Sequence, residues 1–354
     1  MKWGVWYWLV FAMAVFFVWK NVHIKAEQIV LHSNEFGKEV SHDVQNNHGM
    51  SIRKVVIYPY ENADKNHMLE QRGILIIHPG AKATIIICHG FMCDMVDTGF
   101  LRTLFTPKKY NFLTFNFRAH GQSAGEQECT FGQNEALDVS AAAQFVRHHP
   151  ALHEKPLFVY GFSMGSVAAI EAQSQDCTLF DAMILDCPFD SSEAVLKHNI
   201  DRIKFSICGY EFGMPGKGIL QKYAFNPYVQ TFLKAALKTV VHLDAKNIPI
   251  NICPFYPFES IRSVTVPCFF IHCRHDEKVP VDSVLNVFEN AQGHKELWIT
   301  AGRRHFDSFF YNPEEYIRRI NQFFDSILDG SYCDTKVQRS VREDSIEIMR
   351  DINN

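Results

Sequence analysis

Short apolar runs recur along the chain and alternate with longer stretches that have helical spacing of hydrophobic residues. Beyond residue 80 these runs are mostly apolar, which is typical of strands that are buried on both faces of a sheet. The runs are ATIIICHG (83–90), NFLTFNFR (111–118), LFVYG (157–161), AMILDCPF (182–189), CFFIHC (268–273) and ELWIT (296–300).

Helical patterns lie between and after these runs. Residues 132–149 have helical spacing, a small-residue stretch follows Ser163, and a last helix is predicted from Pro313 to a stop at Gly330. Upstream, KVVIYPY (54–60) and GILIIH (73–78) predict a strand pair joined by a polar loop. Strands that alternate with helices predict an α/β fold with a mostly parallel central sheet and helices on both faces.

One internal segment breaks this rhythm. Residues 190–262 are rich in Phe, Tyr and Gly and contain no strong strand run, so we expect a mainly helical cap inserted into a main domain that spans 53–330. Residues 21–52 are polar and rich in His and Asn, which predicts a linker. Residues 331–354 predict a polar C-terminal tail.

The N-terminal segment WGVWYWLVFAMAVFFVW (3–19) has no charged residue and is flanked by Lys2 and Lys20, with tryptophans near both ends. This pattern predicts a single-pass membrane anchor over residues 1–20. The alternatives are a cleaved signal peptide, which would make the protein secreted or periplasmic, and a soluble docking helix. No small-residue cleavage site follows the apolar run, which disfavours cleavage.

Charge and cysteine content indicate which partners and which cellular compartment to expect. The formal net charge of the 354 residues is -4, so there is no basic footprint for nucleic acid. The ten cysteines include no C-x-x-C pair and no Cys/His spacing typical of zinc sites, so we expect no metal. Several cysteines lie within or at the ends of apolar runs, as buried free thiols do. Reduced thiols favour a main domain that faces the cytosol.

The stretch from Gly161 to Gly165, GFSMG, fits the G-x-S-x-G nucleophile elbow. Such a turn is so tight that its flanking positions lack room for side chains, and it presents a hydroxyl at the edge of the sheet beside the N–H groups of the following helix. A serine hydroxyl becomes a nucleophile once a base takes its proton. The motif therefore predicts Ser163 as a nucleophile.

Two loops further along the chain offer the acid and the base. Asp276 follows the run CFFIHC and His305 follows the run ELWIT, so both are expected at the sheet edge that carries Ser163. His305 would take the proton of Ser163, and Asp276 would hold the imidazole in the required tautomer. Asp186 is a rival for the acid, and Asp276 has an alternative role in capping a turn.

Other histidines compete with His305 for the role of base. His272 lies inside an apolar run and is expected to be a core residue, His294 precedes its strand and is expected at the opposite edge, and His275 also lies near Asp276. An oxyanion hole needs two N–H donors. We expect them from the backbone of Met164, directly after the nucleophile, and of Phe91 in the loop after an earlier strand.

These motifs, in this order, resemble the α/β-hydrolase superfamily. They are HGF (89–91), NFRAHGQSAGE (116–126), GFSMG (161–165), DEKVP (276–280) and the late His305. The chain is similar in particular to serine aminopeptidase-like and Bem-type α/β-hydrolase-domain proteins. The resemblance implies an α/β-hydrolase fold, a serine hydrolase with the triad Ser163, Asp276 and His305, and no metal or organic cofactor. It also implies that Arg118, His120 and Ser123 form a structural turn.

The resemblance implies hydrolysis of an ester, thioester or amide through an acyl-enzyme intermediate, without choosing among them. The anchor and the aromatic residues of the cap favour an apolar, lipid-like acyl substrate, although those residues would equally form the core of the cap. They are Phe205, Tyr210, Phe212, Tyr223, Phe225 and Phe232. The alternatives are a catalytically silent scaffold and a different reaction on the same fold, such as acyl transfer or a cofactor-free haloperoxidase-like activity.

Overall fold

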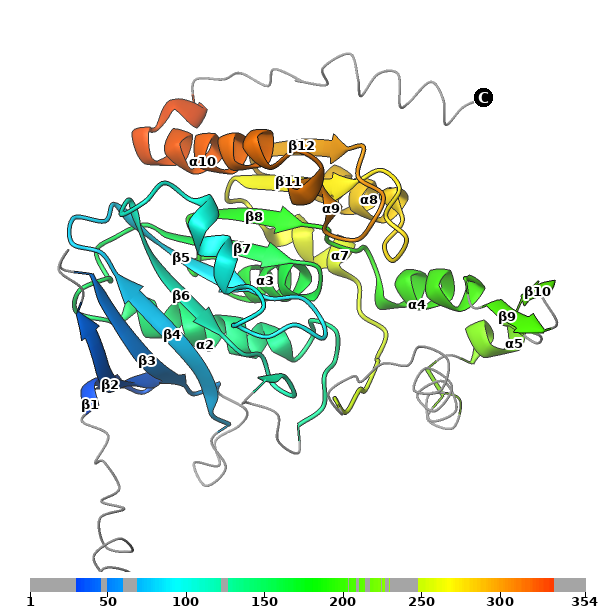
Figure 1. Ribbon diagram of the computed structural model, residues 1–354, viewed down its shortest axis with the longest axis horizontal. Helices are drawn as coiled ribbons and strands as arrows, with labels where there is room; N and C mark the ends of the chain where they lie inside the picture. Colours follow the sequence, from blue (N-terminus) through cyan, green and yellow to red (C-terminus); the bar gives the residue numbers. More distant parts are fainter. Residues whose placement is uncertain are drawn as a thin grey trace, which may run out of the picture.

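A computed structural model describes most of the predicted main domain and small parts of the insertion. The described residues are 30–45, 50–59, 69–121, 127–202, 204–207, 210–213, 217–223, 225–226, 229 and 248–333. Within them, a ten-stranded sheet has the order β1-β2-β3-β4-β6-β5-β7-β8-β11-β12. Figure 1 shows this twisted sheet with helices on both sides.

The centre and one flank of the sheet are parallel, as predicted. The parallel strands are β5 (Ala83–Cys88), β6 (Tyr110–Phe115), β7 (Leu157–Phe162), β8 (Ala182–Asp186), β11 (Cys268–Cys273) and β12 (Lys295–Thr300). Every residue of these strands except those of β12 is buried, which explains the continuous apolar sequences. Their carboxyl ends therefore meet at one edge of the sheet.

The other flank is antiparallel. The predicted pair of strands forms as β3 (Ser51–Ile57) and β4 (Gln71–Ile77), and β4 joins the parallel part through β6. Two further strands, β1 (Val30–Asn34) and β2 (Gly37–Gln45), extend this flank. The linker predicted for 21–52 is therefore wrong for the residues in β1 and β2, which belong to the sheet.

A buried charge on β2 explains why the hydrophobicity pattern does not predict this strand. Glu39 is fully buried, and its carboxylate bonds Arg53 Nη1 at 2.7 Å and His149 Nε2 at 2.6 Å. Burial alone would raise the pKa of Glu39, but these two partners lower it below its usual value. Because Glu39 points inward, a polar residue occupies a position at which the pattern of a strand requires an apolar one.

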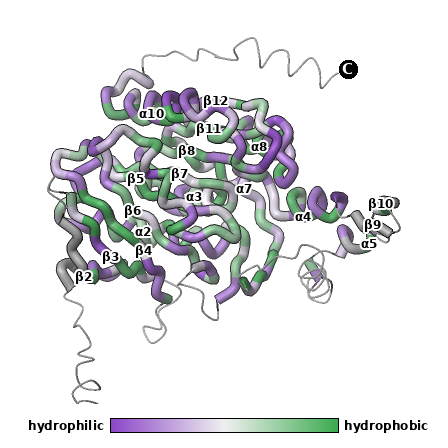
Figure 2. The backbone as a smooth tube through the Cα atoms, viewed as in Figure 1, coloured by the Kyte–Doolittle hydropathy of each residue, from purple (hydrophilic) through white to green (hydrophobic). Residues whose placement is uncertain are grey.

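Two hydrophobic layers hold the helices to the sheet. The helices α2 (Glu135–Arg147), α3 (Met164–Gln175) and α8 (Val281–Asn290) share one layer with the sheet, and η1 (Gly99–Leu104) and α10 (Pro313–Asp329) share the other. Figure 2 shows the hydrophobic stretches running through the central strands. The last helix has the predicted limits, since it begins at Pro313 and the left-handed Gly330 ends it.

The insertion projects from the edge of the body in Figure 1. Its described residues include the helices α4 (Ser192–Asp201) and α5 (Lys217–Lys222) and an antiparallel hairpin of β9 (Lys204–Ile207) and β10 (Tyr210–Gly213). The chain returns to the body through α7 (Pro257–Ser260) and η3 (Ile261–Ser263). The hairpin differs from the predicted helical content because strands of four residues give almost no periodic signal.

The prediction of a single-pass membrane anchor, and of a membrane localisation with it, is corrected here. Across the described ranges, no helix is both long enough and apolar enough to span a bilayer. The segment on which that prediction rested, residues 1–20, lies outside the described residues, as do the last residues of the tail, 334–354.

Candidate active site

Ser163 lies at the sharp junction between β7 and α3, as the motif predicts. Its backbone has φ 51° and ψ −116°, a conformation that non-glycine residues rarely adopt. A Cβ atom at Gly161 would lie 2.6 Å from the Cα of Ser166, and one at Gly165 would lie 2.2 Å from the carbonyl oxygen of Cys88. Both glycines are therefore required by the packing of the elbow against its neighbours.

Asp276 and His305, which the sequence places in separate loops, are hydrogen-bonded to each other. His305 Nδ1 lies 2.7 Å from Asp276 Oδ2. The other oxygen of Asp276, Oδ1, accepts the N–H groups of Lys278 at 2.8 Å and Val279 at 3.0 Å. Burial raises the pKa of Asp276, but the hydrogen bond and charge of His305 outweigh burial and leave it below its usual value. The carboxylate is thus ionised at neutral pH and orients the imidazole.

His305 also contacts the elbow. Its ring centroid lies 5.2 Å from that of Phe162, the residue before Ser163. The side chain of His305 is 11% exposed, whereas that of Asp276 is fully buried. The three predicted triad residues therefore come from the carboxyl ends of β7, β11 and β12 and gather at one edge of the sheet.

The two predicted oxyanion donors belong to segments that pack closely together. The Gly165 backbone lies against the carbonyl groups of Cys88 and His89 at the end of β5, and a Cβ atom at Gly90 would lie 2.7 Å from the ring of Phe162. Phe91 directly follows Gly90, and Met164 begins α3. The loop after β5 and the first turn of α3 thus bring these two backbone segments side by side.

The rival acid Asp186 serves other contacts. Its Oδ2 accepts hydrogen bonds from the hydroxyls of Tyr316 at 2.6 Å and Tyr160 at 3.1 Å. Burial raises the pKa of Asp186 to about 6. Its backbone carbonyl oxygen accepts the N–H of Ser163 at 2.7 Å, so Asp186 supports the elbow through its main chain.

The histidines that compete with His305 for the role of base lie in other positions or make other contacts. His294 lies at the opposite edge of the sheet, because its carbonyl oxygen bonds the N–H of Cys268 at the start of β11. His272 is buried within β11, and burial lowers its pKa to about 4. The backbone N–H of His275 bonds the carbonyl oxygen of Gly302. Of these histidines, His305 is the one that bonds the Asp276 carboxylate.

The HGF and RAHG motifs form a buried hydrogen-bonded turn. His89 Nε2 accepts the N–H of Phe117 at 3.0 Å, and Arg118 forms a buried ion pair with Asp138 at 2.7 Å. His120 Nδ1 lies 2.8 Å from the carbonyl oxygen of Arg118. Ser123 lies outside the described residues. Sequence reasoning missed Asp138, because one acid within a helix carries no sign of a buried partner.

Comparisons with known proteins find a hydrolase family and α/β-hydrolase-domain relatives. Residues 79–203 match the family described as "Serine aminopeptidase, S33". The chain is 26% identical over 249 residues to the uncharacterised protein YqkD of Bacillus subtilis, which covers 70% of this chain and 73% of YqkD. It is 22% identical to human alpha/beta hydrolase domain-containing protein 17B, over 69% of this chain and 67% of the relative. The chain is therefore similar to α/β-hydrolases.

Solved structures show that the chain has the α/β-hydrolase fold. The esterase Pf2001 of Pyrococcus furiosus superposes with a TM-score of 0.53 at 22% identity, over 77% of this chain and 92% of the esterase. The peroxisomal alpha-beta-hydrolase Lpx1 of Saccharomyces cerevisiae superposes with a TM-score of 0.54 at 15% identity, over 87% and 97% of the two chains. At these identities the likeness concerns the fold alone.

The insertion is attached to the loop that carries Asp276. On α4, His198 Nε2 lies 3.0 Å from the carbonyl oxygen of Glu277, and the Asn199 amide donates to the carbonyl oxygen of Lys278 at 3.1 Å. Both acceptors directly follow Asp276 in the chain. The insertion therefore begins beside the candidate site.

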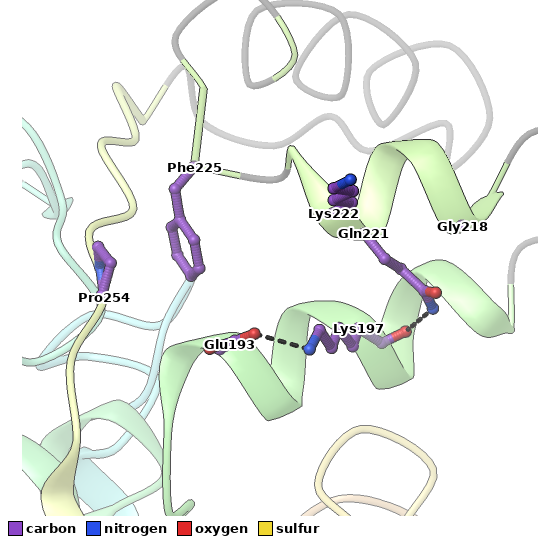
Figure 3. A pocket seen from close by; sticks show the side chains of 7 residues that line it. All are labelled: Glu193, Lys197, Gly218, Gln221, Lys222, Phe225 and Pro254. Atoms are coloured by element: carbon purple, nitrogen blue, oxygen red, sulfur yellow. Dashed lines mark hydrogen bonds and ion pairs between the residues drawn. The ribbon is translucent and has the colours of Figure 1, made fainter.

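A hollow of about 460 Å³ lies between α4 and α5 (Figure 3). Lys197 bonds Glu193 along α4 at 2.6 Å. Across the hollow, the carbonyl oxygen of Lys197 accepts the Gln221 amide at 3.3 Å. Phe225 is the aromatic residue of its lining, whereas Phe212 and Tyr223 are exposed. The side chains of Phe205, Tyr210 and Phe232 lie outside the described residues. This polar, open hollow does not match the apolar pocket that the cap aromatics were expected to form.

A different group of aromatic residues extends from His305 to the surface. Phe306 lies with its ring centroid 4.4 Å from that of Phe162, and the rings of Phe309 and Phe310 on α9 (Asp307–Tyr311) follow it. Phe100 of η1 lies 5.8 Å from Phe309. Phe310 is 65% exposed. Sequence reasoning missed this group, which we name the aromatic ridge (Phe100, Phe306, Phe309 and Phe310), although the run HFDSFFY, which begins at His305, signals it.

Proposed function

We propose that this protein is a serine hydrolase that cleaves a carboxylic ester, thioester or amide through an acyl-enzyme intermediate. The observation that carries the proposal is the 2.7 Å hydrogen bond between His305 Nδ1 and Asp276 Oδ2, beside the elbow of Ser163. Because the ionised Asp276 accepts at Nδ1, that nitrogen carries the proton and Nε2 is the nitrogen that can accept one. The third member, Ser163, lies in the strained turn that the elbow chemistry uses.

In the proposed reaction the Ser163 oxygen attacks the substrate carbonyl while its proton passes to His305 Nε2. Asp276 stabilises the imidazolium that forms, and the backbone N–H groups of Phe91 and Met164 bind the oxyanion. His305 then returns the proton to the leaving alcohol, thiol or amine. In the second half a water molecule attacks the acyl-enzyme and gives its proton to His305. His305 passes this proton to the Ser163 oxygen as the bond between that oxygen and the acyl carbon breaks and the acid leaves.

We infer that the acyl group of the substrate is apolar and lies along the aromatic ridge. The ridge begins at Phe306, which packs against Phe162 of the elbow, and ends at the exposed ring of Phe310. An exposed aromatic surface that adjoins a candidate nucleophile favours burial of an acyl chain. The name of the Pyrococcus furiosus relative, an esterase, agrees with ester substrates.

The direct test is labelling with a fluorophosphonate probe, whose phosphorus is captured by an activated serine oxygen with loss of fluoride. We expect the wild-type protein to be labelled and Ser163→Ala to be unlabelled. Ser174→Ala, on the same helix α3 but with its hydroxyl bonded to the Glu171 carbonyl oxygen, is the matched control and keeps the label. Labelling that survives in Ser163→Ala would remove this residue from the proposed role.

The leaving group is then determined with p-nitrophenyl esters of increasing chain length, acyl-CoA thioesters and aminoacyl anilides. The proposal expects turnover of at least one of these classes, and the preferred class distinguishes an esterase, a thioesterase and a peptidase. Labelling without turnover of any of them would favour the scaffold or acyl-transfer alternatives.

A further inference from the structure

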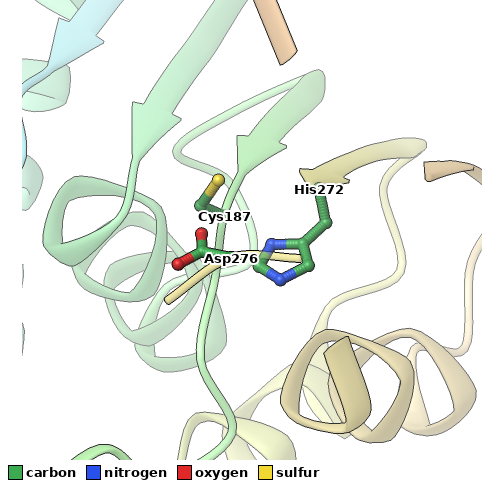
Figure 4. Close-up of side chains that lie close together, drawn as sticks. All are labelled: Cys187, His272 and Asp276. Atoms are coloured by element: carbon green, nitrogen blue, oxygen red, sulfur yellow. The ribbon is translucent and has the colours of Figure 1, made fainter. Parts of the chain in front are cut away.

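Two buried side chains, those of Cys187 and His272, lie close to the carboxylate of Asp276. Within the described ranges, Cys187, His272 and Asp276 form a group whose ligand atoms all lie within 4.8 Å of one another. Cys187 follows β8, His272 lies in β11, and Asp276 lies in the loop after β11. Figure 4 shows the ring of His272 turned toward the other two residues.

The His272 ring has a nitrogen lone pair available in this group. Its Nε2 lies 3.1 Å from the carbonyl oxygen of Val279, and because a carbonyl only accepts, Nε2 carries the proton. The neutral ring then has its lone pair on Nδ1, which is buried and has no hydrogen-bond partner among the described residues. Metal-bound histidines typically donate their other nitrogen to a carbonyl group in this way.

One oxygen of the Asp276 carboxylate can accept a further bond. Oδ1 already accepts two backbone N–H groups, from Lys278 and Val279. Oδ2 accepts from His305 alone among the bonds of the described part of the chain. A cation bound in this group would therefore share, or take over, the oxygen that orients His305.

We propose that Cys187, His272 and Asp276 form a binding site for Zn²⁺. One sulfur, one imidazole nitrogen and one carboxylate oxygen make a mixed ligand set that suits this borderline-soft cation. Ligand atoms of tetrahedral zinc lie roughly 3–4 Å apart, so the side chains need to close by up to about 2 Å. The thiol of Cys187 donates to Asp186 Oδ1 at 3.2 Å. On binding, this hydrogen bond and the S–H bond break, the proton passes by way of the Asp186 carboxylate to solvent, and a sulfur–zinc bond forms.

Binding of zinc at this site would inhibit hydrolysis. The cation draws on Asp276 Oδ2 and so weakens its hydrogen bond to His305, which leaves the imidazole without its orienting partner. The cation would enter from the substrate side, where the His305 side chain is 11% exposed. This consequence rests on the proposed function, whereas the binding itself does not.

The test uses full-length protein stripped with a chelator and titrated with Co²⁺, a spectroscopic substitute for Zn²⁺. We expect a thiolate-to-cobalt charge-transfer band that ZnCl₂ removes. Cys187→Ser should abolish the band, and His272→Gln should weaken Zn²⁺ affinity by more than about 10-fold. Zinc should also inhibit turnover by wild-type protein, with each variant normalised to its own activity without metal. Circular dichroism and melting temperature check that the variants are folded.

Two cysteines provide matched controls. Cys268→Ser changes an equally buried thiol at the other end of β11, and Cys177→Ser changes an exposed one. Both should keep the band. A wild-type protein without the band, or a band that persists in Cys187→Ser, overturns the proposed site. Since the band does not depend on turnover, it remains informative even if Ser163 is not labelled by the fluorophosphonate probe.

Discussion

The hydroxyl of Ser166 lies 2.9 Å from the carbonyl oxygen of Asp186 and so ties the first turn of α3 to the end of β8. The same hydroxyl lies 2.8 Å from the carbonyl oxygen of Ser163, and the two acceptors share its hydrogen. Ser166 is fully buried. This one side chain therefore links the elbow to the neighbouring strand. Its hydrogen bonds help to hold Ser163 in the strained conformation.

Replacing Ser166 by alanine should lower the free energy of unfolding by about 1 kcal/mol. The effect stays modest because both carbonyl oxygens keep a backbone N–H donor. It is measured by urea unfolding, together with kcat/KM, which should fall because the nucleophile is held less rigidly. Ser174→Ala is the control and should change the unfolding free energy by less than about 0.5 kcal/mol. Equal effects of the two changes would contradict the role assigned to Ser166.

Gly165→Ala should destabilise the protein by about 1–3 kcal/mol. The added methyl group would lie 2.2 Å from the backbone carbonyl oxygen of Cys88, and neither backbone can move without disturbing the elbow. Gly218→Ala is the matched change at an exposed position of α5 with nothing within 4 Å, where alanine should be neutral or slightly stabilising. Thermal unfolding of both variants measures the difference. A stable, active Gly165→Ala protein would show that the close packing is not required.

The parallel half of the sheet could be predicted from sequence because its strands are buried on both faces and read as uninterrupted apolar runs. That regularity also predicted that Asp276 and His305 lie at the sheet edge that carries Ser163, since the carboxyl ends of parallel strands lie on the same side. The bond between Asp276 and His305 could only be anticipated from chain order, and the structure supplies its length of 2.7 Å.

What sequence could not reveal are contacts between distant residues. Strand β2 was missed because its inward Glu39 is paired with Arg53 and His149, a pairing that no local pattern signals. The group of Cys187, His272 and Asp276 was missed for a similar reason. Its members come from separate elements and have none of the close spacing by which zinc sites are recognised in a sequence.

The buried His272 should make the protein sensitive to acid. Its pKa is about 4 in the folded protein, against about 6.5 when exposed, so the folded state holds the neutral ring. The contribution is fully present above pH 6.5 and is lost as the pH falls from 6.5 to 4, by up to about 3 kcal/mol. Asp186, whose pKa is raised to about 6, acts in the opposite direction below pH 6 and masks part of this loss.

The difference in unfolding free energy between wild-type protein and His272→Gln isolates this effect, because Asp186 titrates in both proteins. Measured by urea unfolding, the advantage of the wild type should shrink steadily between pH 6.5 and pH 4. His153→Gln, at an exposed position, is the control for the loss of a histidine that is not buried. A difference for His272→Gln that is constant over the same range would contradict the neutral buried ring.

Phe310→Ala should impair long-chain substrates selectively. The ring is 65% exposed, so its removal should change stability by less than about 0.5 kcal/mol. If an acyl chain lies on the aromatic ridge, the lost contact is worth about 1.4 kcal/mol and kcat/KM falls about 10-fold for long-chain esters. Short acetyl esters do not reach α9 and should be unaffected. Ile219→Ala removes an equally exposed apolar side chain on α5 and should alter neither substrate. A uniform loss across chain lengths would mean that Phe310 acts on the site rather than on the acyl chain.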